Sequence, residues 1–181
     1  MQKIVEKLGW KLHWRLDKFR DPSDEISTLL QHGAPMTEIL KRFADSYLGK
    51  TEWDGNVGLN EGLAELIDLG FGLGSPTAFD TTNGYLGVGD SSTGENASQT
   101  GLQAPTNKLY KIFDDTYPSR TGQTVEARAT FGTDEANFAW EEYTIANGSS
   151  DSAVNLNRKT ASKGTKASGE TWTLSVSVTL S

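Results

Sequence analysis

The sequence predicts an α+β fold, in which a C-terminal antiparallel β-sandwich-like domain follows an N-terminal half with a few short helices. Residues 171–180 alternate between apolar and hydroxyl-bearing side chains, which is typical of a strand with one buried face. Apolar residues in 37–47 and 59–69 instead recur at spacings of three and four, which is typical of amphipathic helices. The 19 glycines fit many turns between short strands.

A strand is expected first, over residues 8–16, before Pro22 interrupts the pattern. Its alternating apolar positions are Leu8, Trp10, Leu12, Trp14 and Leu16. Two interpretations of this face stay open. We favour an ordinary core face; the alternative is a partner-docking surface formed by Trp10, Leu12 and Trp14. The same segment could also be an edge strand that adds to a neighbour's sheet.

Helices are expected over residues 24–32, from Thr37 to just before Gly49, and over residues 59–69. The apolar side of the third helix is formed by Leu59, Leu63, Leu66 and Ile67. Gly70 is its expected C-cap, and the glycine-rich residues 70–75 are expected to form a flexible connection. A further helix is expected within residues 102–115, because Leu109, Ile112 and Phe113 have helical spacing.

The remaining strands are expected at residues 84–90, 125–131, 138–145, 155–158 and 171–180. In the last of these, the apolar residues from Trp172 to Leu180 are expected in the core, and the intervening residues, Thr173 among them, in solvent. The chain is thereby divided into residues 1–75, an N-terminal strand plus helical docking region, and residues 76–181, the antiparallel β domain.

Composition narrows the possible partners. The formal net charge of −7 gives no counterion release on DNA, so nucleic acid is not an expected partner. The absence of cysteine excludes disulfides and thiolate chemistry. No stretch approaches the roughly 20 apolar residues that span a bilayer, and residues 1–7 lack the apolar run of a secretory signal. We therefore expect a protein that stays in solution, with no membrane partner.

Candidate sites for metal or phosphate chemistry are weak. The two histidines, His13 and His32, have no neighbours at ligand spacing, and without cysteine a structural zinc site is not expected. The glycine-rich run from Gly70 to Gly74 lacks the Lys-Ser/Thr of a phosphate-binding loop, so a hinge is expected there. Oxygen ligands for calcium could come from Asp90, Ser91, Ser92 and Glu95, but the spacing is not that of an EF-hand and a solvated loop is favoured.

Paired carboxylates are equally poor candidates for acid–base catalysis. Glu141 and Glu142 are adjacent on an expected strand, so their side chains should point to opposite faces. Asp114 and Asp115 are expected at a solvated helix end. We therefore predict no catalytic residue, no cofactor and no metal site, and a protein that is not an enzyme.

A series of short segments characterises the last hundred residues. They are Gly84–Thr93 (GYLGVGDSST), Gln99–Gln103 (TGL at its centre), Ala129–Gly132 (ATFG), Ala136–Glu142 (ANFAWEE), Leu156–Lys159 (LNRK), Lys163–Lys166 (KGTK) and Thr171–Leu174 (TWTL). In this order they resemble structural proteins of tailed bacteriophages over roughly residues 84–181. Residues 8–16 and 56–62 show a looser similarity to the same proteins. A weaker similarity, mainly in VGDS and the later strands, extends to N-terminal domains of tail-collar and tail-fibre proteins.

The resemblance implies a non-enzymatic virion structural protein that is assembled in the host cytoplasm and contributes no catalytic residues. We expect a head protein, a capsid decoration (cement) or head-fibre subunit outside the major capsid shell, because the chain is small and has no receptor-binding extension after Leu180. The alternatives are a tail protein, a neck, baseplate or tail-fibre attachment component, and a small glycan-binding module. Expected partners are the major capsid protein or other virion subunits, and further copies of the chain in a homo-oligomer.

Overall fold

The computed structural model describes residues 9–181, which form two five-stranded antiparallel sheets and three α-helices. The first sheet has the order β2-β1-β10-β7-β6. Its strands are β1 (Trp10–Arg20), β2 (Tyr47–Asp54), β6 (Ser119–Thr121), β7 (Thr124–Phe131) and β10 (Glu170–Leu180). Leu8, which belongs to the first predicted strand, lies outside the described residues. The predicted α+β fold with a sandwich-like β body is confirmed.

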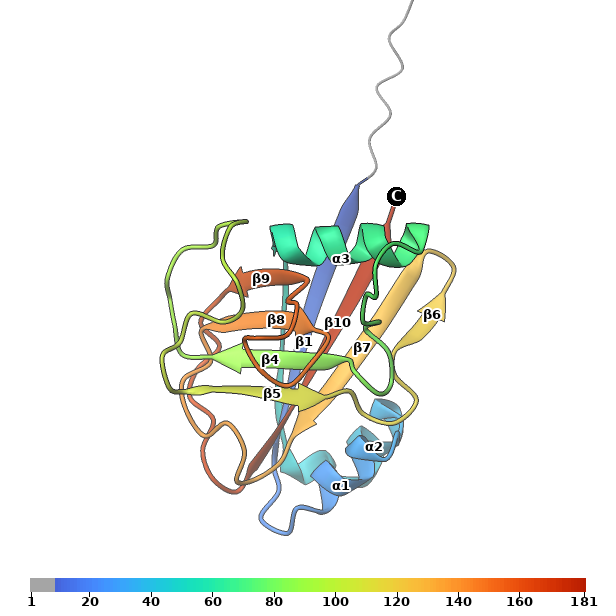
Figure 1. The fold of residues 1–181 in the computed structure, drawn as a ribbon. Coiled ribbons are helices and arrows are strands. Elements are labelled where there is room, and N and C mark those ends of the chain that lie inside the picture. Colours follow the sequence, from blue (N-terminus) through green and yellow to red (C-terminus); the bar gives the residue numbers. More distant parts are fainter. Residues whose placement is uncertain (1–8) are drawn as a thin grey trace, which may run out of the picture.

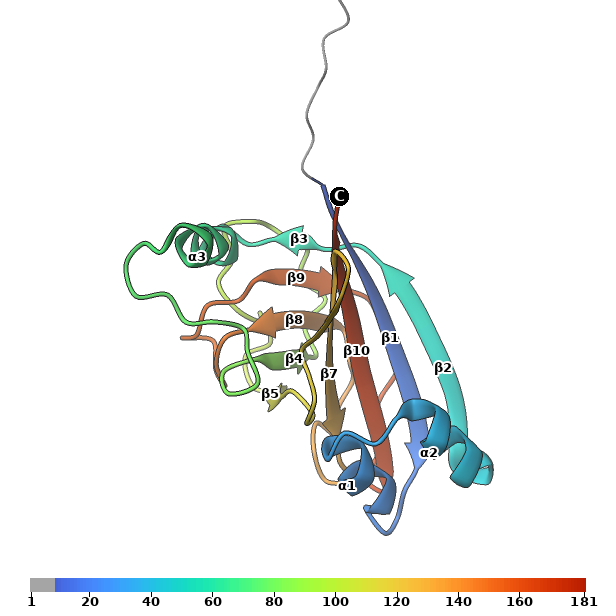
Figure 2. The ribbon, with the colours of Figure 1, turned by 90° about the vertical axis from the view of Figure 1, so that its right-hand side faces the viewer.

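The second sheet has the order β3-β9-β8-β4-β5. Its strands are β3 (Val57–Gly58), β4 (Tyr85–Gly89), β5 (Lys108–Ile112), β8 (Glu142–Ala146) and β9 (Asn157–Thr160). Figure 1 shows that these strands cross those of the first sheet at a steep angle, and Figure 2 shows the two sheets as facing layers. Helix α3 (Asn60–Phe71) lies at one end of this body, and α1 (Glu25–Gln31) and α2 (Met36–Arg42) lie at the other.

The first and last strands of the described chain pair with each other along their full length. The antiparallel register runs from Trp10 opposite Leu180 to Arg20 opposite Glu170. β1 is therefore an interior strand between β2 and β10, and the prediction that it forms an edge is wrong; β2 and β6 are the edges. The same pairing joins the two predicted regions, because β1 and β2 share one sheet with strands from beyond residue 75.

Large aromatic side chains fill the space between the sheets. The ring of Trp140 packs edge-on against Phe131 and Trp172, with centroids 4.8 and 4.9 Å apart. Trp14 contacts Tyr143 from the facing sheet, with ring centroids 5.9 Å apart. Such aromatic contacts add to the free energy gained by burying apolar area, so this cluster is the main core of the molecule.

Helices α1 and α2 cover part of the outer face of the first sheet and form a second core. Phe19 of β1 packs there with Ile26, Leu30 and Ile39, all of them buried. This cover also buries Thr173, whose hydroxyl lies 3.1 Å from that of Thr130. The expectation that Thr173 faces solvent is wrong. An alternating pattern separates the two faces of a strand, but it does not show whether a helix covers the polar face.

Asp114 is part of the same buried region. Its carboxylate accepts hydrogen bonds from Arg128 Nε at 2.7 Å and from the amide and hydroxyl of Thr130. Burial raises the pKa of Asp114 above its ordinary value, and the charge of Arg128 opposes that rise. Arg128 also donates to the carbonyl of Leu30 at the end of α1. The prediction of a solvated helix end at Asp114 is therefore wrong.

One predicted helix is shorter than expected, and another is replaced by a strand. The helix expected to continue to just before Gly49 ends at Arg42, and residues 47–54 form β2 instead. The helix expected within residues 102–115 is β5, which pairs with β4. Helices α1 and α3 lie near their predicted positions, as do strands β1, β4, β7, β9 and β10. The strand predicted at 138–145 begins only at Glu142, and β3 and β6 have no predicted counterpart.

Substitutions in β10 test the assignment of its buried face. Trp172→Ala and Val176→Ala should each lower the free energy of unfolding by about 2–5 kcal/mol, because each leaves a cavity in the main core. Ser177→Ala on the outer face should change it by less than about 0.5 kcal/mol. Chemical denaturation measures these values, and equal losses for all three variants would show that the faces are wrongly assigned.

Candidate functional site

Helix α3 is attached to the body through its polar side. Glu61 accepts a hydrogen bond from the amide of Asn155 at 3.0 Å. Glu65 accepts from the amide of Thr77 at 2.6 Å and from the side-chain amide of Asn147 at 2.9 Å. Between these carboxylates, Gly62 packs so closely that an added Cβ would lie 2.3 Å from the Cα of Leu156. The helix therefore contacts the second sheet through its carboxylates and a glycine, while Leu66 and Leu69 line an apolar cavity that they share with Ile145 and Leu156.

The opposite side of α3 exposes apolar residues. Leu63, Ile67 and Phe71 are 41%, 54% and 77% exposed, and their spacing of four places them along one stripe of the helix. Leu66 flanks the stripe, and Leu73 follows the helix end; both are also exposed. A surface helix normally turns its apolar stripe inward and its charges outward. We call these five residues, Leu63, Leu66, Ile67, Phe71 and Leu73, the α3 apolar surface.

An apolar cavity of about 310 Å³ adjoins the α3 apolar surface. It lies between α3 and the ends of both sheets, and its lining includes Trp10, Leu66, Phe79, Val178 and Leu180. Trp10 reaches it beside Gly58, where an added Cβ would come within 2.8 Å of the indole ring and 3.5 Å of Leu63. Helix and cavity together form a contiguous apolar site at one end of the molecule.

The predicted docking residues divide between this site and the core. Leu12 and Trp14 are 2% and 0% exposed and belong to the main core, which was the favoured interpretation of their face. They therefore offer no surface to a partner in this structure. Trp10 is half-buried and borders the cavity, so a docking role for Trp10 stays a prediction. The helix predicted at residues 59–69 is α3. Of its predicted apolar side, Leu59 is buried, but Leu63, Leu66 and Ile67 are exposed instead of facing the interior.

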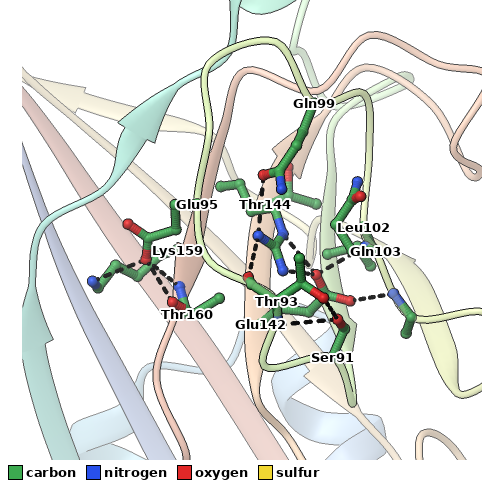
Figure 3. Close-up of polar contacts among 12 residues, drawn as sticks. Ser91, Thr93, Glu95, Gln99, Leu102, Gln103, Glu142, Thr144, Lys159 and Thr160 are labelled. Atoms are coloured by element: carbon green, nitrogen blue, oxygen red, sulfur yellow. Dashed lines mark hydrogen bonds and ion pairs between the residues drawn. The ribbon is translucent and has the colours of Figure 1, made fainter.

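A second polar feature fixes the loop between β4 and β5, which begins with Asp90 and Ser91 of the VGDS segment. Glu142 and Arg158 on neighbouring strands form a fully buried ion pair, with Arg158 Nε 2.7 Å from the carboxylate. Glu142 also accepts hydrogen bonds from the amides of Gln103 and Ala104, at 2.9 and 2.7 Å (Figure 3). Arg158 donates to the carbonyl of Thr93 at 2.8 Å. Both ends of the loop are therefore tied to one ion pair.

Glu95 holds the middle of the same loop. Its carboxylate accepts from the amide and hydroxyl of Thr160 and from Lys159 Nζ at 3.1 Å (Figure 3). Burial alone would raise the pKa of Glu95, but the hydrogen bonds from Thr160 and Lys159 lower it below its ordinary value. Asp90 binds the side chain of Asn107 instead of approaching Glu95. Of the four residues considered for calcium, Asp90, Ser91 and Glu95 thus bind three different sets of partners, Asn107, Thr93, and Thr160 with Lys159. The loop, for which solvation was favoured, is anchored to β9 through Glu95.

Other candidate residues are also occupied by structural contacts. His13 pairs with Asp54 at 2.8 Å, and His32 is bound to the carbonyl of Thr28 at 2.8 Å. No group of three or more His, Cys, Asp or Glu side chains within residues 9–181 is arranged to hold a metal ion. In the same range no helix has the length and apolar character needed to cross a membrane. The candidate site is therefore the α3 apolar surface with the cavity that adjoins it.

No protein-family model, no curated protein sequence and no solved structure matches this chain. The assignment of a function therefore depends on the site itself and on the segments described above.

Substitutions on the α3 apolar surface test whether it contributes to folding. Ile67→Ser and Phe71→Ser should change the free energy of unfolding by less than about 0.5 kcal/mol, because both side chains already face water. Leu59→Ala, just before the same helix, should cost about 2–5 kcal/mol, because Leu59 is fully buried. Binding of a hydrophobic dye should fall in the two serine variants. A large stability loss at Ile67 or Phe71 would mean that the stripe packs against the body.

A second prediction concerns the buried ion pair of Glu142 and Arg158. Arg158→Met should lower the free energy of unfolding by about 3–5 kcal/mol, because it leaves the Glu142 carboxylate buried without its countercharge. Limited proteolysis should then cut within residues 93–104 faster than in the wild type. Arg42→Met removes an exposed ion pair and should cost no more than about 1 kcal/mol. Equal, small effects of the two arginine changes would contradict this role of Arg158.

Proposed function

We propose that this chain is a non-enzymatic structural protein of a tailed-phage particle. In this proposal it is a capsid decoration (cement) or head-fibre subunit that binds the outside of the major capsid shell through the α3 apolar surface. The observation that carries the proposal is the orientation of α3, which turns Glu61 and Glu65 into the body and leaves Ile67 and Phe71 exposed. A helix held in this way has its apolar side free for a partner.

The energetics of such a surface suit a protein–protein contact. Complete burial of one Leu, Ile or Phe side chain contributes about 1.5–3 kcal/mol. Contiguous apolar patches on soluble proteins mark interaction sites. A capsid offers the same binding position many times, and a subunit attached at several points gains avidity beyond each single contact. A modest apolar surface is therefore sufficient for stable decoration.

The assignment to a phage particle is supported by the resemblance of residues 84–181 to tailed-phage structural proteins. The segments that carry it contribute β4, the anchored loop after it, and Leu156, whose backbone packs against Gly62 of α3. The segments that resemble virion proteins thus build the platform on which the exposed helix is mounted.

The same structure supports a role without catalysis. The buried carboxylates of Glu142 and Asp114 are neutralised by Arg158 and Arg128, and both hold backbone segments in place. These carboxylates therefore have a structural role. The exposed site beside α3 is lined by apolar side chains.

Particles that lack this protein provide the test. They should lose infectivity faster on heating or osmotic shock, and added wild-type protein should restore their stability. The double variant Ile67→Ser/Phe71→Ser should fail to bind and to restore it, because both substitutions remove apolar contact area. Ile112→Ser removes an apolar side chain that is 40% exposed on the edge strand β5, and this variant should restore stability like the wild type.

The number of copies per particle distinguishes a head protein from a tail protein. A decoration subunit should be present in hundreds of copies per particle by quantitative mass spectrometry. A dozen or fewer copies would favour a tail, neck or baseplate component. Unchanged stability of the depleted particles would contradict cementing, and absence of the protein from mature particles would contradict the whole proposal.

A further inference from the structure

The outermost strand of the first sheet, β2, has one free edge. β2 (Tyr47–Asp54) pairs with β1 on one side, and among residues 9–181 no strand pairs with its other side (Figure 2). Its eight residues make it much longer than β6, the three-residue strand at the opposite edge. Leu48, Lys50 and Glu52 are exposed along it. A long, uncovered edge presents backbone N–H and C=O groups that can pair with another strand.

The charges on β2 have a particular order. Lys50 and Glu52 stand on the outer face of the sheet, opposite Asp17 and Arg15 of β1 in the strand register. Lys50 Nζ lies 3.1 Å from both carboxylate oxygens of Glu52. Thr51 lies between them on the other face. Charged residues usually protect an edge strand from pairing, but a positive and a negative charge two residues apart can also be matched by a second strand.

We propose that β2 pairs with β2 of a second copy of this chain, antiparallel and with the two-fold axis at Thr51. In this register Lys50 of each copy lies opposite Glu52 of the other, on the same face of the joined sheet. The four charges then alternate in sign. The first sheet of one copy and the first sheet of the other become one continuous sheet. The proposal does not depend on attachment to a phage particle, because it uses an edge away from α3.

Electrostatics select this register from its neighbours. A shift of two residues in one direction puts Lys50 opposite Lys50. A shift in the other direction pairs Lys50 with Asp54 but puts Glu52 opposite Glu52 at the two-fold axis. Parallel pairing in register would also place like charges beside each other. Like charges directly opposite one another destabilise a strand pair, whereas opposite charges stabilise it. A shift of one residue would turn the charged side chains to the other face. Among these arrangements, the antiparallel register centred on Thr51 is the one that pairs opposite charges and places no like charges directly opposite each other.

A charge-swap series on the purified full chain tests the proposal. Sedimentation equilibrium at low ionic strength should show a wild-type dimer. Lys50→Glu and Glu52→Lys should each raise the dimer dissociation constant at least about tenfold, because each creates two like-charge contacts per dimer. The double variant Lys50→Glu/Glu52→Lys should restore the affinity to within about threefold of the wild type, since its charges match again. Lys11→Glu, an equal charge change on the interior strand β1, should leave the dimer unchanged.

Other outcomes would overturn the proposal. A wild-type chain that stays monomeric at all concentrations would do so. A dimer that survives both single substitutions, or that is lost in Phe71→Ser instead, would also do so and would place the contact elsewhere. The particle-binding experiment with Ile67→Ser/Phe71→Ser is read out separately, so failure of the α3 docking and failure of the β2 pairing can be told apart.

Discussion

The pairing of β1 with β10 is the constraint on which the rest of the structure depends. It joins the first and last strands of the described chain over 11 residues each and places alternating apolar side chains from both against the second sheet. Because β1 is held between β10 and β2, one edge of the first sheet falls at β2. Because the ladder ends at Trp10 and Leu180, both residues border the cavity beneath α3. The two surfaces proposed for binding thus follow from one strand pairing.

Buried ionic contacts then fix the parts that the hydrophobic core does not hold. Glu142 and Arg158 anchor the loop after β4, and Asp114 and Arg128 anchor the end of α1. Each carboxylate is satisfied by backbone or hydroxyl donors as well as by its arginine, which offsets the cost of removing charges from water. These contacts leave the loops well positioned and the reactive groups occupied, which fits a molecule that binds partners through apolar and strand-edge surfaces.

Much of the fold could be predicted because strict alternation leaves little ambiguity. β1, β7 and β10 have apolar side chains at alternating positions, so burial of one face predicts a strand. β5 was misassigned because Leu109, Ile112 and Phe113 also match helical spacing, and a five-residue segment is too short for the two periods to differ. Pairing with β4, which is a tertiary contact, determines that this segment is a strand. β2 was missed because its exposed edge carries charged residues and lacks an apolar alternation.

The orientation of α3 could not be derived from sequence. Glu61 and Glu65 form one stripe of the helix, and Leu63 and Ile67 form another. An amphipathic helix is ordinarily expected to face the core with its apolar stripe. The structure reverses this because donors for both carboxylates lie on the body: the amides of Asn155 and Thr77 and the side chain of Asn147. Those donors come from segments distant in sequence, so their position is known only from the folded chain.

Radical footprinting of α3 in the free chain and in intact particles tests the central claim most directly. Phe71 should be labelled in the purified protein, where it is 77% exposed, and strongly protected in the particle. Ile112, which is exposed on β5 away from α3, should be labelled in both states. Equal labelling of Phe71 in the free and particle-bound protein would contradict the claim that the apolar side of α3 is the docking surface.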